Sequence, residues 1–527
     1  MHNLGHIVPS ASPEEAPFAV LWPSAESQRT RIQELLHDIE IGSIPSAQTD
    51  FDNLFKSLLK AAGNYRGTGY LPIEGLTRYL AQERKFAKTT LPFLASVARH
   101  LPDLFPQARL LVPVAGLKHM MRSHPSVHLR RIQVLGLMAA SFFGTIPHNQ
   151  RELLKKFGDL RLNALNMHSK GFFNREPKLK ALLTYFSEMQ KTMGSCWEMM
   201  LKNNDFTQAK CPAACSCQEG RVGSTSPVDE IISFYLHTPE ATTFVAPGGQ
   251  KVQRSSVDVD AIVSQPLPLS DATVDLHGDI TKSDGNLQVD FADRFLGGLS
   301  MFEGHIAQEE LLFALRPELH AIMLFKPALK DDEAVVIKGA ESFVDYTGYE
   351  KTFKVFPPEV PVGSHWSVHR RTPLDSMGRR ETTLVGIDAI QFRDKKKQYS
   401  IQSMKREILK AALGFQGDPF ESSIHEGRAG VATGKWGCVI FNGDNELKTL
   451  LQWIALSAVG RTMHYKAFGD SQLESMEETL LAIRSRFPTT KDLFGAIVEC
   501  IQQREESPGD EWSLWQSLLK LETKKPQ

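Results

Sequence analysis

The sequence predicts an all-helical region followed by an α/β domain with a central mixed sheet, and three observations support this division. Up to about residue 203, apolar residues recur at the spacing of one helix face. From about residue 228, short apolar runs typical of strands alternate with amphipathic helical runs. Between them lies a stretch rich in Gly, Ser and Pro with no apolar period. We therefore expect a poorly ordered tail at residues 1–25, a helical accessory domain at 26–203, a linker at 204–228 and the α/β domain at 229–527.

The composition predicts a soluble intracellular protein of several domains. The 527 residues are 42% hydrophobic, which is ample for the cores of about two to four domains. The 60 basic and 61 acidic residues nearly cancel, so a polyanionic ligand must be met by a local basic patch or by backbone amides. No apolar run reaches the roughly eighteen residues of a membrane span, and the first residues lack the pattern of a signal peptide. We therefore expect no membrane contact.

Apolar stripes at helical spacing run through residues 26–203, and the very apolar run Val127–Gly144 predicts a buried helix. A further helix is predicted at Pro177–Met193, where Pro occupies a first-turn position. Such stripes are usually packing surfaces and only rarely binding grooves. We expect this region to support the α/β domain.

The six cysteines indicate a reducing compartment rather than a disulfide framework. Three of them, Cys211, Cys215 and Cys217, lie in the predicted linker with the spacing CxxxCxC. Three thiolates leave a zinc ion one ligand short, and no second Cys pair follows. We expect free thiols here, with a metal site as the weaker alternative, and the sequence implies no cofactor.

In the α/β domain the predicted strands and helices alternate. The general rule for open α/β sheets places a ligand outside the carboxyl ends of the strands. The predicted strands are Leu287–Phe291, His320–Phe325, Ala334–Lys338, Thr382–Asp388, Gly437–Phe441 and Met463–Phe468. The predicted helices include Gln308–Leu315, Ile401–Leu413, Glu446–Val459 and Gln472–Phe487.

The α/β domain is organised around the stretch Leu287–Leu319. It predicts a strand, then the glycine pair Gly297 and Gly298, then a helix whose first turn carries Glu309 and Glu310. Adjacent helical residues project about 100° apart, so one carboxylate can face a substrate while the other braces it. Glycines and a helix N-terminus suit phosphate oxygens. The stretch suits a sugar phosphate whose glycosidic bond lies beside a carboxyl group; the alternative is a pair of solvated acids that complement the helix dipole.

Five segments, taken in order, resemble the poly(ADP-ribose) glycohydrolase family. They are LQVDFADRF with the glycines and QEE (Leu287–Glu310), YTGYEKTF (Tyr346–Phe353), GRRETTLVGIDAIQFR (Gly378–Arg393), VATGKWGCVIFNGD (Val431–Asp444) and YKAFGDSQL (Tyr465–Leu473). The resemblance implies a macrodomain-like catalytic domain preceded by the helical accessory domain of animal-type members. It also implies hydrolysis of the ribose–ribose O-glycosidic bonds of poly(ADP-ribose), with release of ADP-ribose.

The resemblance implies partners and compartments as well. The partners would be poly(ADP-ribose) and ADP-ribosylated proteins, in the nucleus and cytoplasm, as part of the DNA damage response. Direct DNA binding is not expected, because the overall charge is near neutral and short basic runs such as FRDKKKQ (Phe392–Gln398) are mostly solvated faces. The sequence carries no signal of oligomeric state.

Catalysis is expected from three acids. The resemblance implies that Glu310 is the general acid and base, that Glu309 holds ribose hydroxyls and that Asp290 contacts the ribose. A general acid at neutral pH needs a raised pKa, whereas a helix N-terminus favours the ionised form. The dipole is worth about 0.3 to 1 kcal/mol, under one pKa unit, while burial can move the pKa of a carboxyl by several units. Burial against the bound substrate is therefore expected to decide the balance.

The other expected contacts divide between base, diphosphate and distal ribose. The resemblance implies that Tyr349 stacks on the adenine and that Phe468 closes that side. Phe441 would pack on the distal ribose, and Gln308 would hydrogen-bond the substrate. Backbone approach to the diphosphate is expected at Gly297, Gly298, Lys435, Trp436, Gly437, Cys438, Val439 and Ile440.

Four positions depart from the family pattern. Leu299 replaces a third glycine; a leucine at positive φ would cost about 1 to 2 kcal/mol, and otherwise its side chain can crowd the cleft. Asp293 replaces an asparagine, which removes an amide donor and adds a charge near the diphosphate. Lys435 also replaces an asparagine and can offset that charge. At the adenine contact Ile280 aligns, but Thr281 replaces a glutamate.

These departures leave open a second class of function, a binding module that keeps the pocket and has lost turnover. Retention of Gln308, Glu309 and Glu310 together favours the enzyme, because a binding module does not need two acids beside an anionic ligand.

Overall fold

The computed structural model describes residues 26–62, 74–105, 121, 124–146, 175–207, 226–301, 306–324, 326, 328–356, 372–421, 428–506 and 512–522. The predicted tail at residues 1–25 and the three cysteines of the predicted linker lie outside these ranges. Within them, no helix combines the length and the apolar character that crossing a bilayer requires.

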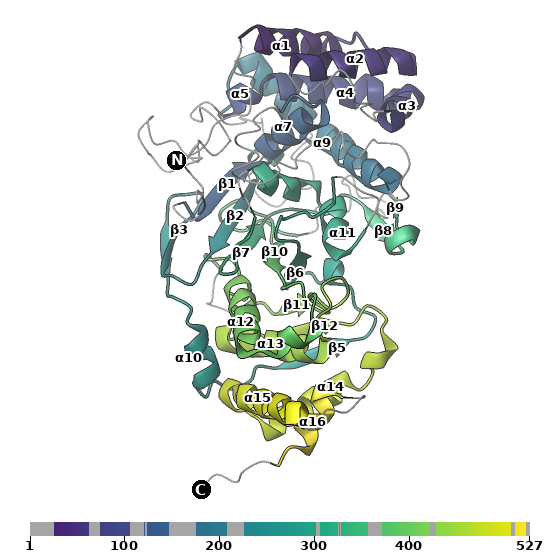
Figure 1. Ribbon diagram of the computed structural model, residues 1–527. Coiled ribbons are helices and arrows are strands. Elements are labelled where there is room, and N and C mark those ends of the chain that lie inside the picture. Colours follow the sequence, from purple (N-terminus) through teal and green to yellow (C-terminus); the bar gives the residue numbers. More distant parts are fainter. Residues whose placement is uncertain are drawn as a thin grey trace.

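The N-terminal part is a stack of helices at one end of the molecule (Figure 1). Each amphipathic helix buries one apolar face; α1, for example, buries Ile32, Leu35, Leu36 and Ile39. The predicted buried helix is present as α7, whose residues are all buried. The helices are α1 (Glu26–Glu40), α2 (Gln48–Ala61), α3 (Glu74–Gln82), α4 (Arg84–Arg99), α5 (Leu101–Leu104), α7 (Arg131–Phe142) and α9 (Arg175–Asn203).

The prediction of a helix over Val127–Gly144 is wrong at its start. Ser126–Arg130 form strand β1, which pairs antiparallel with β2 (Ile231–His237) at the edge of the main sheet. Burial largely alternates along β1, as the period of a strand requires. Helix α7 begins only after it, where the backbone N–H of Arg130 donates to the side chain of Gln133 (2.8 Å). The region expected to be all-helical therefore contributes a strand to the α/β domain.

Eight strands form the main sheet in the order β1-β2-β7-β10-β6-β11-β12-β5. The pairings from β1 to β10 are antiparallel, and those from β10 to β5 are parallel, so the carboxyl ends of five strands share one edge. This confirms the predicted central mixed sheet. Besides β1 and β2, the strands of the main sheet are β5 (Ala272–Asp275), β6 (Leu287–Ala292), β7 (Ala334–Lys338), β10 (Thr383–Asp388), β11 (Val431–Thr433) and β12 (Met463–Lys466). Two small sheets have two strands each: β3 (Thr242–Val245) pairs with β4 (Lys251–Arg254), and β8 (Asp345–Thr347) pairs with β9 (Lys354–Phe356).

Helices cover both faces of the sheet. On β7, Val335 joins the core shared with the N-terminal helices, whereas Val336 joins the core shared with the C-terminal helices. Figure 1 shows these two layers at opposite ends of the molecule, with the sheet between them. The helices of this part are α10 (Val259–Ser264), α11 (Gln308–Leu315), α12 (Ile401–Phe415), α13 (Asn445–Val459), α14 (Met476–Arg486), α15 (Thr490–Glu506) and α16 (Leu514–Lys520).

Three predicted elements of the α/β domain differ from the structure. The strand predicted at His320–Phe325 is a fully buried 3-10 helix, Pro317–Leu324, because a short apolar run does not distinguish a buried strand from a buried helix. The strand predicted at Gly437–Phe441 is a turn; the strand there is β11, six residues earlier. The predicted helix Gln472–Phe487 is divided into a 3-10 turn and α14.

Candidate active site

A pocket of about 620 Å³ opens at the carboxyl ends of the parallel strands, where the rule for open sheets places a ligand. It is lined by most of the predicted site residues: Ile280, Thr281, Asp293, Gly298, Gln308, Glu309, Glu310, Tyr349, Lys435, Trp436, Gly437, Val439, Ile440, Phe441 and Phe468. The other three, Asp290, Gly297 and Cys438, do not line it.

Glu309 is the bracing acid of the pair. Its Oε1 accepts the N–H of Gly297 (2.6 Å) and its Oε2 accepts the N–H of Asp293 (2.9 Å). This side chain therefore joins the first turn of α11 to the end of β6 and to the glycine loop. Burial raises the pKa of Glu309 well above its ordinary value, and Asp290 and Glu310 raise it further, while the two N–H groups oppose the shift.

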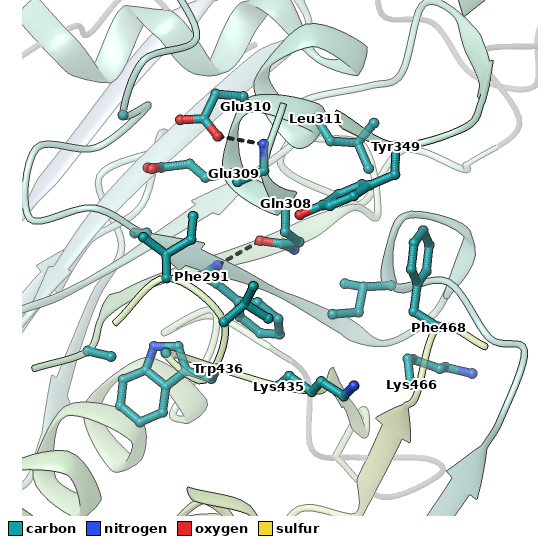
Figure 2. A pocket seen from close by; sticks show the side chains of 18 of the residues that line it. Phe291, Gln308, Glu309, Glu310, Leu311, Tyr349, Lys435, Trp436, Lys466 and Phe468 are labelled. Atoms are coloured by element: carbon teal, nitrogen blue, oxygen red, sulfur yellow. Dashed lines mark hydrogen bonds between the residues drawn. The ribbon is translucent and has the colours of Figure 1, made fainter. Parts of the chain in front are cut away.

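Glu310 lies beside it in the pocket wall (Figure 2), and this residue is 7% exposed. Its Oε1 accepts the N–H of Leu299 (2.9 Å) and its Oε2 accepts the N–H of Ala307 (3.0 Å). The loop between them needs a glycine at Gly298, which has φ of +46°: a Cβ there would stand 2.5 Å from Glu310 Oε1 and 2.7 Å from Glu309 Oε2. The glycine pair thus lets both acids reach the backbone of the loop.

Asp290 lies on β6 and does not line the pocket, so its expected contact with a ribose stays a prediction. Its Oδ1 is buried and has no hydrogen-bond partner among the described residues. Burial raises the pKa of Asp290 well above its ordinary value, and Glu310 raises it further. The residue is thus the innermost of three neighbouring acids.

Gln308 holds α11 against β6. Its Oε1 accepts the N–H of Phe291 (2.8 Å) (Figure 2). Its Nε2 donates to the carbonyl of Val289 (2.8 Å). Gln308 was expected to bond the substrate. In the structure both ends of its amide bond the strand, so Gln308 positions the two acids that follow it, and its bond to the substrate stays a prediction.

Two aromatic rings close one end of the pocket. Tyr349 and Phe468 meet edge to face, with ring centroids 5.7 Å apart, and the hydroxyl of Tyr349 is directed toward Gln308 (Figure 2). Burial raises the pKa of Tyr349 to about 12, with smaller contributions from Glu350 and Glu310, so the ring is a neutral phenol. Phe468 follows β12 and is 54% exposed. A flat base fits such a surface.

The turn that carries Ile280 and Thr281 forms the adjoining wall, and Arg316 holds it from behind. Arg316 Nη2 donates to the carbonyl of Thr281 (3.2 Å) and to Oε1 of Gln288 (2.8 Å). Burial lowers the pKa of Arg316 to about 10. Sequence reasoning missed this residue, because a lone arginine after a helix carries no signal of what it contacts.

The loop after β11 suits an anion. Gly437 has φ of +71°, and a Cβ there would stand 2.5 Å from the Cβ of Ala389. Within the described part of the chain, the N–H groups of Gly437, Val439 and Ile440 have no acceptor. Unpaired N–H groups on a glycine loop form the concavity that phosphate oxygens occupy.

The side chains of this loop differ from the expectation. Lys435 forms an ion pair with Asp470, so it is not the free counter-charge that was expected for Asp293. The indole of Trp436 is buried and donates to the carbonyl of Ile387 (2.9 Å), and its backbone N–H donates to the carbonyl of Gly434 (2.7 Å), so both of its N–H groups are used within the protein. Burial raises the pKa of the Cys438 thiol to about 12, so it is an unreactive thiol behind the wall.

Two departures from the family pattern have local explanations. Leu299 does not have positive φ, so the expected strain does not arise; its side chain lines the pocket and is 37% exposed. Its carbonyl accepts a hydrogen bond from Lys178 of α9 (3.1 Å). The Oδ1 of Asp293 accepts the N–H of Phe295 (2.8 Å), which turns the carboxylate into its own loop.

Sequence reasoning also missed part of the lining. These residues mostly follow strand ends or flank the matched motifs, which is the signal that could have found them. They are Gly278, Asp279, Phe291, Ala292, Ala307, Leu311, Glu350, Ala389, Lys466 and Ala467.

The fold and the site together define an α/β protein of the macrodomain type, in which two buried acids at a helix N-terminus border a pocket of nucleotide size. Two family models match the chain: "Poly (ADP-ribose) glycohydrolase (PARG), Macro domain fold" over residues 259–475 and "Poly (ADP-ribose) glycohydrolase (PARG), helical domain" over residues 80–200. The chain belongs to the poly(ADP-ribose) glycohydrolase family.

Curated relatives agree with this assignment. The chain is 34% identical over 252 residues to "Probable poly(ADP-ribose) glycohydrolase 2" of Arabidopsis thaliana. This match covers 41% of this chain and 46% of the relative. It is 31% identical over 284 residues to "Poly(ADP-ribose) glycohydrolase 1" of the same plant, a match that covers 42% of this chain and 50% of the relative. It is 34% identical over 215 residues to "Poly(ADP-ribose) glycohydrolase 2" of Caenorhabditis elegans, a match that covers 39% of this chain and 42% of the relative. The chain thus spans half or less of the length of these relatives.

Proposed function

We propose that the protein is a poly(ADP-ribose) glycohydrolase that cleaves the ribose–ribose O-glycosidic bond and releases ADP-ribose. The observation that carries the proposal is the placement of Glu310 in the pocket wall, fixed by two backbone N–H groups beside a glycine loop. Family membership and the names of the relatives support it.

The proposed reaction uses the pocket from end to end. The base lies against Tyr349, the diphosphate meets the free N–H groups of the loop after β11, and the distal ribose reaches Glu310. The bond from the anomeric carbon of that ribose to the leaving oxygen breaks through an oxocarbenium-like state. Glu310 donates its proton to the leaving oxygen, then takes a proton from the water that adds to the anomeric carbon.

The test is incubation of the purified protein with labelled poly(ADP-ribose). We expect release of ADP-ribose by the unmodified protein and none by Glu310→Gln, with ADP-ribose still bound by both. Tight binding without release by the unmodified protein would contradict the enzyme and support a binding module that has lost turnover.

Tyr349→Ala examines the base end separately. Because stacking of a base on an aromatic side chain is worth about 1 to 3 kcal/mol, we expect ADP-ribose affinity to fall by that amount in calorimetric titration. An unchanged affinity would return Tyr349 to a packing role.

The proposal extends to the setting of the reaction. We propose ADP-ribosylated proteins as partners, the nucleus and cytoplasm as compartments and the DNA damage response as context, supported by family membership alone. Imaging of the tagged protein before and after DNA damage tests these points, and exclusion from both compartments would contradict them.

A further inference from the structure

An exposed basic turn follows β10. Arg393, Lys395, Lys396 and Lys397 are all exposed, and none of the four pairs with a described residue. The one acid among them, Asp394, is used by the turn itself, because its Oδ1 accepts the N–H of Lys396 (3.0 Å). We call Arg393–Lys397 the basic turn.

The basic turn lies at the end of the pocket opposite to the aromatic pair. In the sheet, β10 is separated from β12 by β6 and β11, and Ala389, just after β10, lines the pocket. The chain then reaches Phe392, whose N–H donates to the carbonyl of Phe441 (3.0 Å) and whose carbonyl accepts from Asn442 Nδ2 (3.1 Å). These bonds attach the basic turn to the loop after β11.

Two exposed apolar side chains belong to the loop after β11. Val439 is 78% exposed and Ile440 is 59% exposed, and both line the pocket. Large apolar side chains at such exposure, next to a ligand pocket, commonly mark a contact surface. A ligand that continued past the pocket would meet this apolar pair and then the unpaired cations.

We infer that the apolar pair Val439–Ile440 and the basic turn form a second binding site, which takes the ADP-ribose unit next to the one in the pocket. This inference rests on the proposed function. Such a unit offers one flat base for the apolar pair and two phosphate charges for the cations. An isolated lysine run is usually a solvated face; here it is joined to the pocket at the end from which a polymer would continue.

The experiment compares Lys395→Gln/Lys396→Gln/Lys397→Gln with the unmodified protein. The matched control is Lys56→Gln/Lys85→Gln/Lys88→Gln, which removes the same charge from exposed lysines of the helical part. Two substrates are used: long poly(ADP-ribose), and ADP-ribose carrying an uncharged fluorogenic aglycone, which has no phosphate beyond the pocket. Affinity for fluorescent polymer is measured in parallel in the Glu310→Gln background.

For the basic-turn variant we expect the KM for polymer to rise about five- to tenfold and its dependence on salt to weaken, because fewer counterions are released on binding. The KM of this variant for the fluorogenic substrate should stay within about twofold of that of the unmodified protein. For the control variant, the KM values for both substrates should stay within the same range. Equal effects on both substrates, equal effects of the control, or no effect on polymer would each overturn the second site. If the unmodified protein hydrolyses neither substrate, the proposed function fails, and the polymer affinities of the two lysine variants still decide the site.

Discussion

Two clusters of three buried acids differ in their counter-charges. In the first, Glu230, Glu318 and Glu341 surround Arg131 of α7, at distances of 3.3, 3.1 and 2.8 Å. Arg380 adds a second cation, 2.6 Å from Glu230. Burial alone would lower the pKa of Arg131, but the three carboxylates raise it above its ordinary value. We call this the junction cluster, because it joins the helical part to the sheet.

The second, which we call the pocket cluster, consists of Asp290, Glu309 and Glu310. Among the described residues no cation forms an ion pair with it, and its hydrogen-bond partners are backbone N–H groups of the glycine loop and its flanks. The pKa values of Asp290 and Glu309 are therefore raised by burial and by the neighbouring acids.

The difference in counter-charge suits the junction cluster to stabilising the fold and the pocket cluster to acid–base chemistry. A buried acid with an arginine partner is held ionised and contributes to the fold, and losing that partner is costly. A buried acid without one is disfavoured in its ionised form, and raised pKa values of this kind are typical of sites of acid–base chemistry. Substitutions in each cluster can therefore show whether the two uses are separable.

The largest expected effect is on turnover. Glu310→Gln removes the proposed proton donor, so we expect kcat to fall by about 10³-fold or more. The amide keeps one of the two N–H acceptors, so the free energy of unfolding should fall by only about 1 kcal/mol. Single-turnover kinetics and urea unfolding of the same sample measure both quantities; retained turnover would refute the assignment.

Arg131→Met should show the opposite profile. It leaves three buried carboxylates without their shared cation, so we expect the free energy of unfolding to fall by about 3 to 5 kcal/mol. The kcat per folded molecule should be unchanged, because Arg131 does not line the pocket. Denaturant unfolding gives the first value. A loss of turnover larger than the loss of folded protein would show that the junction cluster also affects turnover, so that the two clusters are coupled.

The pH dependence of stability distinguishes the clusters more finely. Asp290 and Glu309 have folded pKa values raised above the ordinary 3.8 and 4.5, so above those values the folded state holds protons that the unfolded state has released. The free energy of unfolding should therefore fall as pH rises, by up to about 1.4 kcal/mol per pH unit for each group. Asp290→Asn should reduce this slope in the pH range above the ordinary pKa of 3.8, and an unaltered slope would show that Asp290 is ionised in the folded protein.

The smallest effect is expected at the loop that holds the pocket cluster. Leu299→Gly keeps the N–H that Glu310 accepts, and Leu299 needs no positive φ, so kcat/KM should change by less than about threefold. Steady-state assays on polymer measure it. A gain of tenfold or more would show that the leucine side chain crowds the cleft.

The order strand, glycine pair, helix was predictable from residue spacing alone. Helix α11 has the predicted bounds, because its signals are local: a first turn rich in acids and a proline just after its end. The matched motifs also brought most of the lining together. What the sequence could not show depends on distant partners. Three findings are decided by tertiary contacts: Asp290 is buried without lining the pocket, Lys435 pairs with Asp470, and β1 joins the sheet.

The contribution of β1 to the sheet has a consequence for how the molecule can be divided. A chain cut to begin at residue 229 would lose this strand and the guanidinium of Arg131 together, leaving β2 with an unpaired edge and three acids in the interior without their central cation. The helical part and the α/β part are therefore interlocked, and recombination at the segment between them could not exchange either one as an independent module.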